Sequence, residues 1–221
     1  MRIRYKPWAR PELEASYFYE DTPENCIGKW KEKFNIPKQL LHIELGCGKG
    51  SFISELAFRN QDINYIAIDL VDAMLGLAKR KVEEKYNENN VKVDNLILVR
   101  YDIERINNII NLEDEVKRIY INFCNPWPKS KHKKKRLTHT KQLEHYKEFL
   151  KQGSEIYFKT DDDGLFDDSL KYFEEAGFEV LKKTYNLHAE DIFEGENIVT
   201  EHEKMFSDEG IKIKALIAQL R

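Results

Sequence analysis

The 221-residue sequence has few cysteines and no long apolar run, and both shortages narrow the class of protein that it can encode. Its three cysteines, Cys26, Cys47 and Cys124, are odd in number and far apart, so we expect neither a disulfide framework nor a metal site. No stretch approaches the roughly 20 apolar residues that a membrane-spanning helix needs. The start, MRIRYKPWAR, has no apolar segment behind it, which argues against a secretory signal. We therefore expect a cytoplasmic protein without membrane association.

The sequence also has little net charge, but its charged residues are unevenly distributed. The formal net charge of -3 conceals two basic segments. Residues 1–10 contain four Lys or Arg and no acid, and residues 129–136 (KSKHKKKR) contain six and no acid. Concentrated positive charge on an otherwise acidic chain indicates a directed site for a polyanion, although such a run is also compatible with a merely solvated surface.

Strand-like and helix-like segments alternate along the chain. Short apolar runs predict strands at 40–45, 65–69, 96–100, 119–123 and 155–160. Apolar residues at helical spacing predict helices at 51–60, 73–88, 141–152 and 165–176, with Gly153 and Gly177 closing the last two. Two late strands, at 178–185 and 211–220, lack a clear crossover helix and suggest an antiparallel edge pair. The pattern predicts an α/β, Rossmann-like fold: a mostly parallel seven-stranded sheet with an antiparallel edge strand and helices on both faces.

No linker, internal repeat or low-complexity tract divides the chain. We therefore expect one domain over residues 1–221, with residues 1–25 as an appended arm. This arm mixes the cations Arg2, Arg4, Lys6 and Arg10 with the aromatic side chains of Tyr5 and Trp8. Such a mixture suits RNA docking or ordering on binding, and plain flexibility at a chain terminus is the alternative.

Three strand ends carry residues that an adenosine cofactor needs, and in parallel sheets ligands bind beyond the carboxyl ends of the strands. The first strand runs from Glu44 into the turn GCGKG, where Gly46 and Gly48 permit close backbone approach. Asp69 ends the second strand and suits ribose hydroxyls, and Asp102 follows the third, where it suits the adenine amino group. The spacing GxGxG with its leading glutamate favours S-adenosylmethionine over a dinucleotide.

The fourth strand runs into Asn125 and the sequence PWPK, followed by His132, Arg136 and Leu137. This stretch resembles the tRNA (guanine-N7-)-methyltransferase family, whose pattern is (D)PWPKxxHxxxRL. The resemblance covers nearly the whole chain from about residue 12, and the PWPK-and-basic segment is its most specific part. Further family motifs are matched by the glycine-rich turn, by Lys159-Thr160-Asp161, and by Thr200, Glu203 and Phe206.

The resemblance implies a class I methyltransferase that transfers a methyl group from S-adenosylmethionine to N7 of guanine 46 in the variable loop of tRNA, leaving S-adenosylhomocysteine. It implies that the cofactor is held by Glu44, Asp69, Asp102 and Asn125, together with the glycine-rich turn. For tRNA it implies a larger set of contacts: Lys129, Lys131, His132, Lys133, Lys134, Lys135, Arg136, Asp161, Thr200, Glu201, His202 and Glu203. Two groups in this set have an alternative role, since Thr160-Asp161 and Thr200–Glu203 both fit helix caps.

Asn125 departs from the family pattern, which usually has Asp before PWP. Guanine N7 has an in-plane lone pair and no proton, so its attack on a sulfonium methyl group needs no general base. The reaction needs alignment and exclusion of water. We therefore predict that Asn125, the residue expected at the catalytic centre, positions cofactor or base and accepts no proton. Trp127, two residues on, suits either stacking on an extruded base or covering the core.

Two other functions stay open on the residues alone. Methyltransferases that act on an exocyclic amine, such as adenine N6, or on a protein glutamine place Asn-Pro-Pro-aromatic after the fourth strand, and Asn125-Pro126-Trp127-Pro128 partly matches this. A non-catalytic RNA-binding relative with a degenerate cofactor pocket is the second, but the intact glycine-rich turn and its acids argue against it. The sequence is compatible with a monomer or a homodimer.

Overall fold

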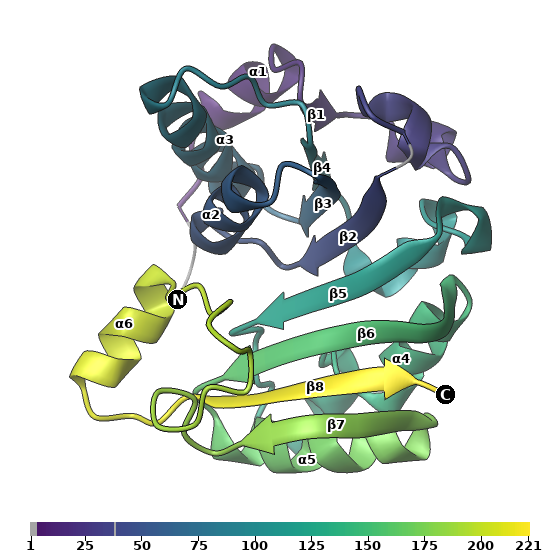
Figure 1. Cartoon of the computed structure of the whole chain (residues 1–221), viewed down its shortest axis with the longest axis vertical. Helices are drawn as coiled ribbons and strands as arrows, with labels where there is room; N and C mark the ends of the chain where they lie inside the picture. Colours follow the sequence, from purple (N-terminus) through teal and green to yellow (C-terminus); the bar gives the residue numbers. More distant parts are fainter. Residues whose placement is uncertain (1–3, 38) are drawn as a thin grey trace. The chain divides into compact units, whose positions relative to one another are not determined.

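The computed structural model describes residues 4–37 and 39–221, and the chain divides into two compact units, 1–114 and 115–221 (Figure 1). One domain over residues 1–221 stays a prediction. Arg2 of the expected arm lies outside the described residues. Within the described part of the chain, no helix combines the length and the apolar character needed to cross a membrane.

The first unit is built on parallel strands in the order β1-β4-β3-β2. Their bounds are β1 (Tyr19–Glu20), β2 (Leu40–Leu45), β3 (Ile63–Asp69) and β4 (Leu96–Arg100). Ile43 of β2 pairs with Ile66 of β3, which pairs in turn with Ile97 of β4. Ile43 and Ile66 are fully buried, which agrees with the mainly apolar composition of these strands. The strands predicted at 40–45 and 96–100 are confirmed at those bounds, and the two-residue β1 was not predicted.

Three α-helices accompany this sheet among the described residues of the first unit: α1 (Ala9–Glu14), α2 (Ser51–Arg59) and α3 (Asp72–Glu88). Four short 3-10 helices connect the elements: η1 (Pro23–Cys26), η2 (Trp30–Lys33), η3 (Ile103–Asn108) and η4 (Leu112–Asp114). Both α1 and α2 pack against α3. Helices α2 and α3 fulfil the expectations for 51–60 and 73–88, each within a residue at its ends.

Residues 9–20 belong to the first unit and do not form a separate arm. Ala9 and Leu13 of α1 are fully buried, and β1 pairs with β4. Helix α1 approaches α3 closely at Gly76, where an added Cβ would lie 2.8 Å from the Cβ of Ala9. Residues 9–20 of the expected arm are therefore packed within the first unit, because their apolar side chains supply a buried face.

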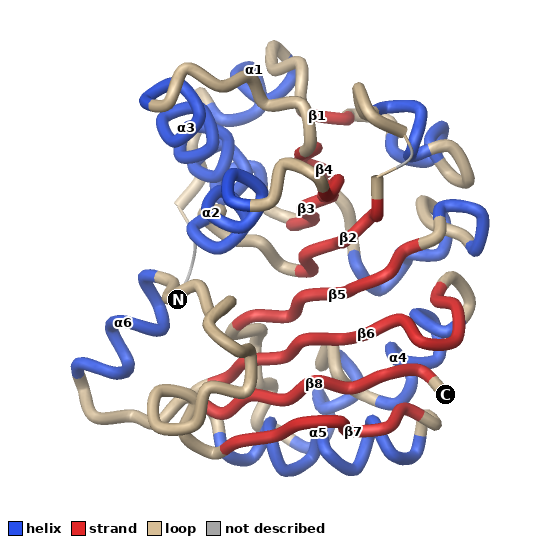
Figure 2. Tube along the Cα trace, viewed as in Figure 1, coloured by secondary structure: helices blue, strands red, loops and turns tan. Residues whose placement is uncertain are grey.

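The second unit has strands β5 (Val116–Asn122), β6 (Leu150–Thr160), β7 (Phe178–Thr184) and β8 (Lys214–Leu220), in the order β5-β6-β8-β7. β5 and β6 are parallel, whereas β8 is antiparallel to both β6 and β7. This confirms a mostly parallel fold with an antiparallel edge. The helices are η5 (Ser130–Lys135), α4 (Thr140–Lys147), α5 (Asp163–Glu175) and α6 (Glu201–Asp208). Helices α4 and α5 pack together and cover one face of the sheet, behind the strands in Figure 2.

The helix predicted at 141–152 is wrong at its end. Helix α4 stops at Lys147, and β6 begins at Leu150. Gly153, expected to close the helix, lies inside β6 with φ +85°, beside an irregularity in the β5–β6 register. The buried Leu150 pairs with Val116 of β5, so strand pairing overrides the helical reading of this segment.

Candidate active site

The glycine-rich turn follows β2 and packs closely on α3. A Cβ added at Gly50, where φ is +74°, would lie 2.6 Å from the Cβ of Ala78, so only glycine allows this approach. At Gly48, where φ is +54°, nothing lies within 4 Å of an added Cβ. The turn is therefore anchored to the helix at one glycine and open at another, which leaves its backbone accessible to a ligand.

Asp69, the last residue of β3, is tied to this turn. Its Oδ2 accepts a hydrogen bond from the Gly48 N–H at 3.0 Å, and its Oδ1 accepts one from the Val71 N–H at 2.9 Å. Burial raises the pKa of the Asp69 carboxyl, although these backbone donors act in the opposite direction. Each carboxylate oxygen has two lone pairs, so the group keeps acceptor capacity for ribose hydroxyls.

Glu44 and Asp102 complete the predicted cofactor residues of the first unit. Glu44 lies near the end of β2, with a side chain only 2% exposed. Asp102 follows β4 and caps η3, its Oδ1 accepting from the Glu104 N–H at 3.0 Å. The three carboxylates thus lie at or near the carboxyl ends of three neighbouring parallel strands, β2, β3 and β4, beside the open turn. This set fits an adenosine cofactor, which needs hydroxyl and amine acceptors and a backbone that it can approach.

In the second unit, Asn125 is exposed and lies in a strained turn after β5. Its Oδ1 accepts a hydrogen bond from the Trp127 N–H at 3.1 Å. Phe123 and Trp127 have φ of +51° and +41°, which costs a non-glycine residue on the order of 1–3 kcal/mol each. Trp127 is half-buried, with the Lys135 Nζ 5.3 Å from its ring centre and the His132 ring 5.7 Å away. The indole therefore contacts the basic segment, and this is compatible both with stacking on a base and with a packing role.

Arg136 differs most from its expected role. The predicted phosphate contact is a buried side chain, 3% exposed. Its Nε donates to the Pro126 carbonyl at 2.6 Å and its Nη1 to the Asp168 carboxylate, also at 2.6 Å. Lys133 donates to the same Oδ2 at 2.6 Å. Arg136 therefore does not present its charge at the surface, and Lys133 is partly neutralised.

Four other cations of this segment remain at the surface. Lys129 follows the turn, and the others lie on η5; all four are exposed: Lys129, Lys131, Lys134 and Lys135. His132 is half-buried beside Trp127. The basic surface for a polyanion is thus narrower than the sequence run indicates.

Asp161 is not a helix cap, because the N-cap of α5 is Asp162, whose Oδ1 accepts from the Leu165 N–H at 2.6 Å. The Asp161 backbone carbonyl accepts from Lys214 Nζ at 2.9 Å, and its half-buried carboxylate lies near the Cys124 thiol. Burial, with a contribution from this carboxylate, raises the pKa of Cys124 to about 12. A thiol protonated at neutral pH is no nucleophile, and the carboxylate of Asp161 stands close to the strained turn.

Helix α6 begins at the predicted cap. Thr200 Oγ1 accepts from the Glu203 N–H at 3.0 Å, which confirms the capping role. The Glu203 side chain is fully buried: Oε2 accepts from Lys159 Nζ at 2.7 Å and Oε1 from Asn197 Nδ2 at 2.9 Å. A direct tRNA contact by this carboxylate would have to displace protein donors on both oxygens. The structure thus gives Glu203 an internal role that the motif match did not indicate.

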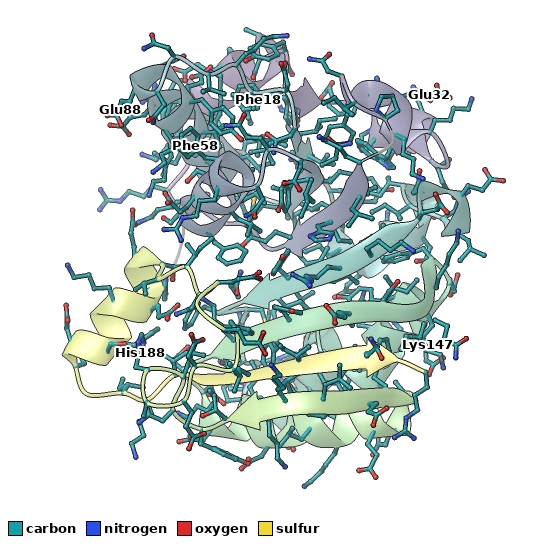
Figure 3. The ribbon with its side chains drawn as sticks, in the orientation of Figure 1. Phe18, Glu32, Phe58, Glu88, Lys147 and His188 are labelled. Atoms are coloured by element: carbon teal, nitrogen blue, oxygen red, sulfur yellow. The ribbon has the colours of Figure 1, made fainter. Side chains whose placement is uncertain are left out.

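Glu201 and His202, in the first turn of α6, are exposed. The His202 ring stacks on Phe123 with 6.0 Å between ring centres, so α6 lies next to the end of β5. Lys159, which the sequence indicates only as part of a motif, is the buried cation that faces Glu203. The sequence feature that could have indicated this role is a lysine that directly follows the apolar residues of a strand. His188, labelled in Figure 3, lies in the loop before α6, with Nε2 3.4 Å from Glu203 Oε1.

The fold and the acids around the glycine-rich turn place the chain in the class I S-adenosylmethionine-dependent methyltransferases. Solved structures share this fold. The 16S rRNA methyltransferase KamB superposes with a TM-score of 0.59 at 13% identity, over 99% of this chain and 95% of that one. The aminoglycoside resistance methyltransferase NpmB1 gives a TM-score of 0.56 at 18% identity, over 91% and 95%.

Sequence comparison is more specific. A family model described as "Putative methyltransferase" matches residues 38–216. A protein of Clostridium beijerinckii named tRNA (guanine-N(7)-)-methyltransferase is 60% identical, over 99% of this chain and 98% of its own length. One of the same name from Ruminiclostridium cellulolyticum is 57% identical, over 100% and 93%. The chain belongs to the tRNA (guanine-N7-)-methyltransferase family.

Proposed function

We propose that this chain methylates N7 of guanine 46, in the variable loop of tRNA. As a member of its family, the chain is an enzyme that transfers a methyl group from S-adenosylmethionine to N7 of guanine in tRNA. The observation that carries the assignment to a nucleic-acid substrate is the exposed lysine surface that continues from the Asn125 turn, at Lys129, Lys131, Lys134 and Lys135. Since the substrate is tRNA, the cytoplasm is its proposed place of action.

The cofactor residues are proposed to be Glu44, Asp69 and Asp102 with the turn at Gly46 and Gly48. When bound, S-adenosylmethionine supplies an electrophilic methyl group on a sulfonium. Guanine N7 attacks with a lone pair and loses no proton, so the chain's own residues have to align the base and exclude water. The elevated pKa of Cys124 agrees with direct transfer that involves no covalent enzyme intermediate.

Asn125 is proposed to position the cofactor or the target base. Its side-chain oxygen already accepts the Trp127 N–H, so the amide is held in place by the turn. Asp161, Thr200, Glu201 and His202 are proposed tRNA contacts, and Asp161 has the best support because the helix cap next to it does not use its carboxylate.

Replacing Asn125 by aspartate should change kcat by less than about tenfold, a barrier change below roughly 1.4 kcal/mol. Aspartate can still accept the Trp127 N–H, and the reaction gives no proton for a base to remove. Asn125→Ala removes that acceptor and should lower kcat further. Single-turnover methylation across a pH series checks both variants; a large gain in the aspartate variant, with a new ionisation in its profile, would show that a base had been missing.

Binding of tRNA should weaken steeply with salt, because the exposed lysines displace counterions from phosphates. Each lysine that contacts one phosphate contributes roughly 0.7–0.9 to the slope of log Kd against log salt. Alanine at Lys131 or Lys134 should therefore make the slope shallower by about that amount. Filter binding of unmodified tRNA over a salt series measures it. A slope near zero for the wild type would rule out the phosphate contacts.

The position in tRNA is tested with two transcripts that differ only in nucleotide 46. At a guanine methylated on N7, borohydride reduction followed by aniline cuts the RNA chain. The modified position can therefore be read on a sequencing gel. We expect cleavage at guanine 46 and none in the transcript with adenine there. Cleavage at another guanine in both transcripts would move the target elsewhere in the molecule.

A further inference from the structure

The turn after β5 cannot hold its shape by local preference. Phe123 and Trp127 both lie in the left-handed region, with φ of +51° and +41°, and neither is glycine. Conformations of this kind persist only where the surrounding structure fixes them, and they are concentrated at functional sites. Asn125 lies between the two strained residues, so whatever fixes the turn also fixes its amide.

The strongest support for the turn comes from a buried guanidinium. Arg136 donates through Nε to the Pro126 carbonyl and through Nη1 to Asp168 Oδ2, each at 2.6 Å. Asp168 lies on α5, a regular helix of 13 residues. Two residues after Arg136, the Thr138 hydroxyl lies 2.7 Å from that of Ser169 on the same helix. The backbone of the turn is therefore connected to α5 through one planar group.

This arrangement is unsuited to phosphate binding by Arg136. Its side chain is 3% exposed, and a phosphate reaching it would have to replace Asp168, an anion already in place. Burial raises the pKa of the Asp168 carboxyl, but hydrogen bonds from Lys133 and Arg136 outweigh this and lower it. The carboxylate is thus ionised at any pH at which tRNA is handled.

We propose that Arg136 is a positioning residue, which holds the Asn125 turn in its active shape through the Pro126 carbonyl and is itself oriented by Asp168. It acts on the reaction through the turn and makes no contact with tRNA. The proposal rests on the proposed function only in that Asn125 and Lys129 serve the reaction. Asp168 then matters for the reaction because it orients Arg136, although its negative charge is unsuited to contact with a polyanion.

The test compares Arg136→Lys, Asp168→Asn and the double variant with Lys134→Ala, a change at an exposed cation of the same basic segment. Lysine cannot reach both acceptors with a planar fork, and asparagine lacks the charge that orients it. We expect each single variant to lower single-turnover methylation by about 100-fold, the usual effect of a small misplacement in an active site. The slope of log Kd for tRNA against log salt should stay unchanged in Arg136→Lys and also in Arg136→Gln, which removes the charge. Asp168→Asn is not used for this slope, because it also frees Lys133. The double variant should lose little more than either single one, because both act on one unit.

Lys134→Ala should instead weaken tRNA binding and make the salt slope shallower. If Arg136 contacts phosphate, Arg136→Gln, which removes the charge, will make that slope shallower; this result overturns the proposal. Full activity in both folded single variants overturns it as well.

A second readout is independent of activity. In protein labelled with 5-fluorotryptophan, the ¹⁹F signal of Trp127 is assigned with Trp127→Phe. We expect Arg136→Lys and Asp168→Asn to move or broaden this signal and to leave those of Trp8 and Trp30 in place. A Trp127 signal that does not move in these variants would refute the positioning role of Arg136. If the wild type is inactive but the variants still move the signal, only the proposed function is refuted. General unfolding would be recognised by changes in all three signals, and the measurement is then made below the unfolding temperature.

Discussion

Replacing Lys159 by methionine is expected to destabilise the second unit by about 3–5 kcal/mol, the usual cost of leaving a buried charge without its partner. The side chains of Lys159 and Glu203 are 3% and 0% exposed, and their charged atoms are 2.7 Å apart. The same ammonium also donates to the Ile198 carbonyl at 2.9 Å and to Asn197 Oδ1 at 3.0 Å. Without it, the segment before α6 loses these polar contacts to β6. Urea unfolding followed by circular dichroism measures the loss.

Two further variants show whether the lost stability comes from the unpaired buried charge. Lys159→Met combined with Glu203→Leu removes both charges and should recover most of the stability, since apolar replacement of a whole buried pair is often neutral. Lys182→Met removes the exposed cation that pairs with Glu194 and should cost no more than about 1 kcal/mol. A loss at Lys159 no larger than at Lys182 would contradict the buried pair.

Replacing Asp69 by alanine is expected to weaken S-adenosylmethionine binding by about 100-fold or more. Hydrogen bonds to a charged group contribute about 1.5–3 kcal/mol each, and two lost ribose contacts account for this factor. The Gly48 N–H also loses its acceptor, which loosens the open part of the glycine-rich turn. Titration calorimetry with the cofactor measures the change directly.

Asp62→Ala provides the matched control for Asp69. It changes an exposed aspartate just before β3, at the opposite end of the same strand, and should leave cofactor affinity at the wild-type value. Asp69→Asn keeps an acceptor oxygen and should fall between the two. Wild-type affinity in Asp69→Ala would show that the cofactor is held elsewhere.

Much of the fold could be predicted because its strands are buried on both faces. Strands β2 and β4 read as short, mainly apolar runs, and the glycine-rich turn after β2 and Asp102 after β4 mark where they end. The two residues of β1 are too few to show any periodicity. The end of α4 was missed because Phe149 and Leu150 are apolar in either conformation, and pairing of Leu150 with Val116 on a distant strand decides between them.

The sequence predicted which residues belong to the candidate site, but not which of their side chains are buried. A run of basic residues does not reveal that Arg136 is directed inward to Asp168, since the acid lies 32 positions further along the chain. Glu203 and Lys159 are separated by 44 positions, so their pairing is a tertiary fact that the motifs could not show. The alternative role of Thr160-Asp161 as the cap of α5 could not be decided by residue type, because Asp161 and Asp162 are equally good caps; the cap is Asp162.

The central claim, methyl transfer to N7 of guanine in tRNA, is tested most directly by product identity. Unmodified tRNA is incubated with the purified chain and labelled S-adenosylmethionine, digested to nucleosides and separated by chromatography. We predict that the label appears as 7-methylguanosine and that no labelled nucleoside forms without the chain. Label in N6-methyladenosine, or no transfer although both tRNA and cofactor bind, would contradict it.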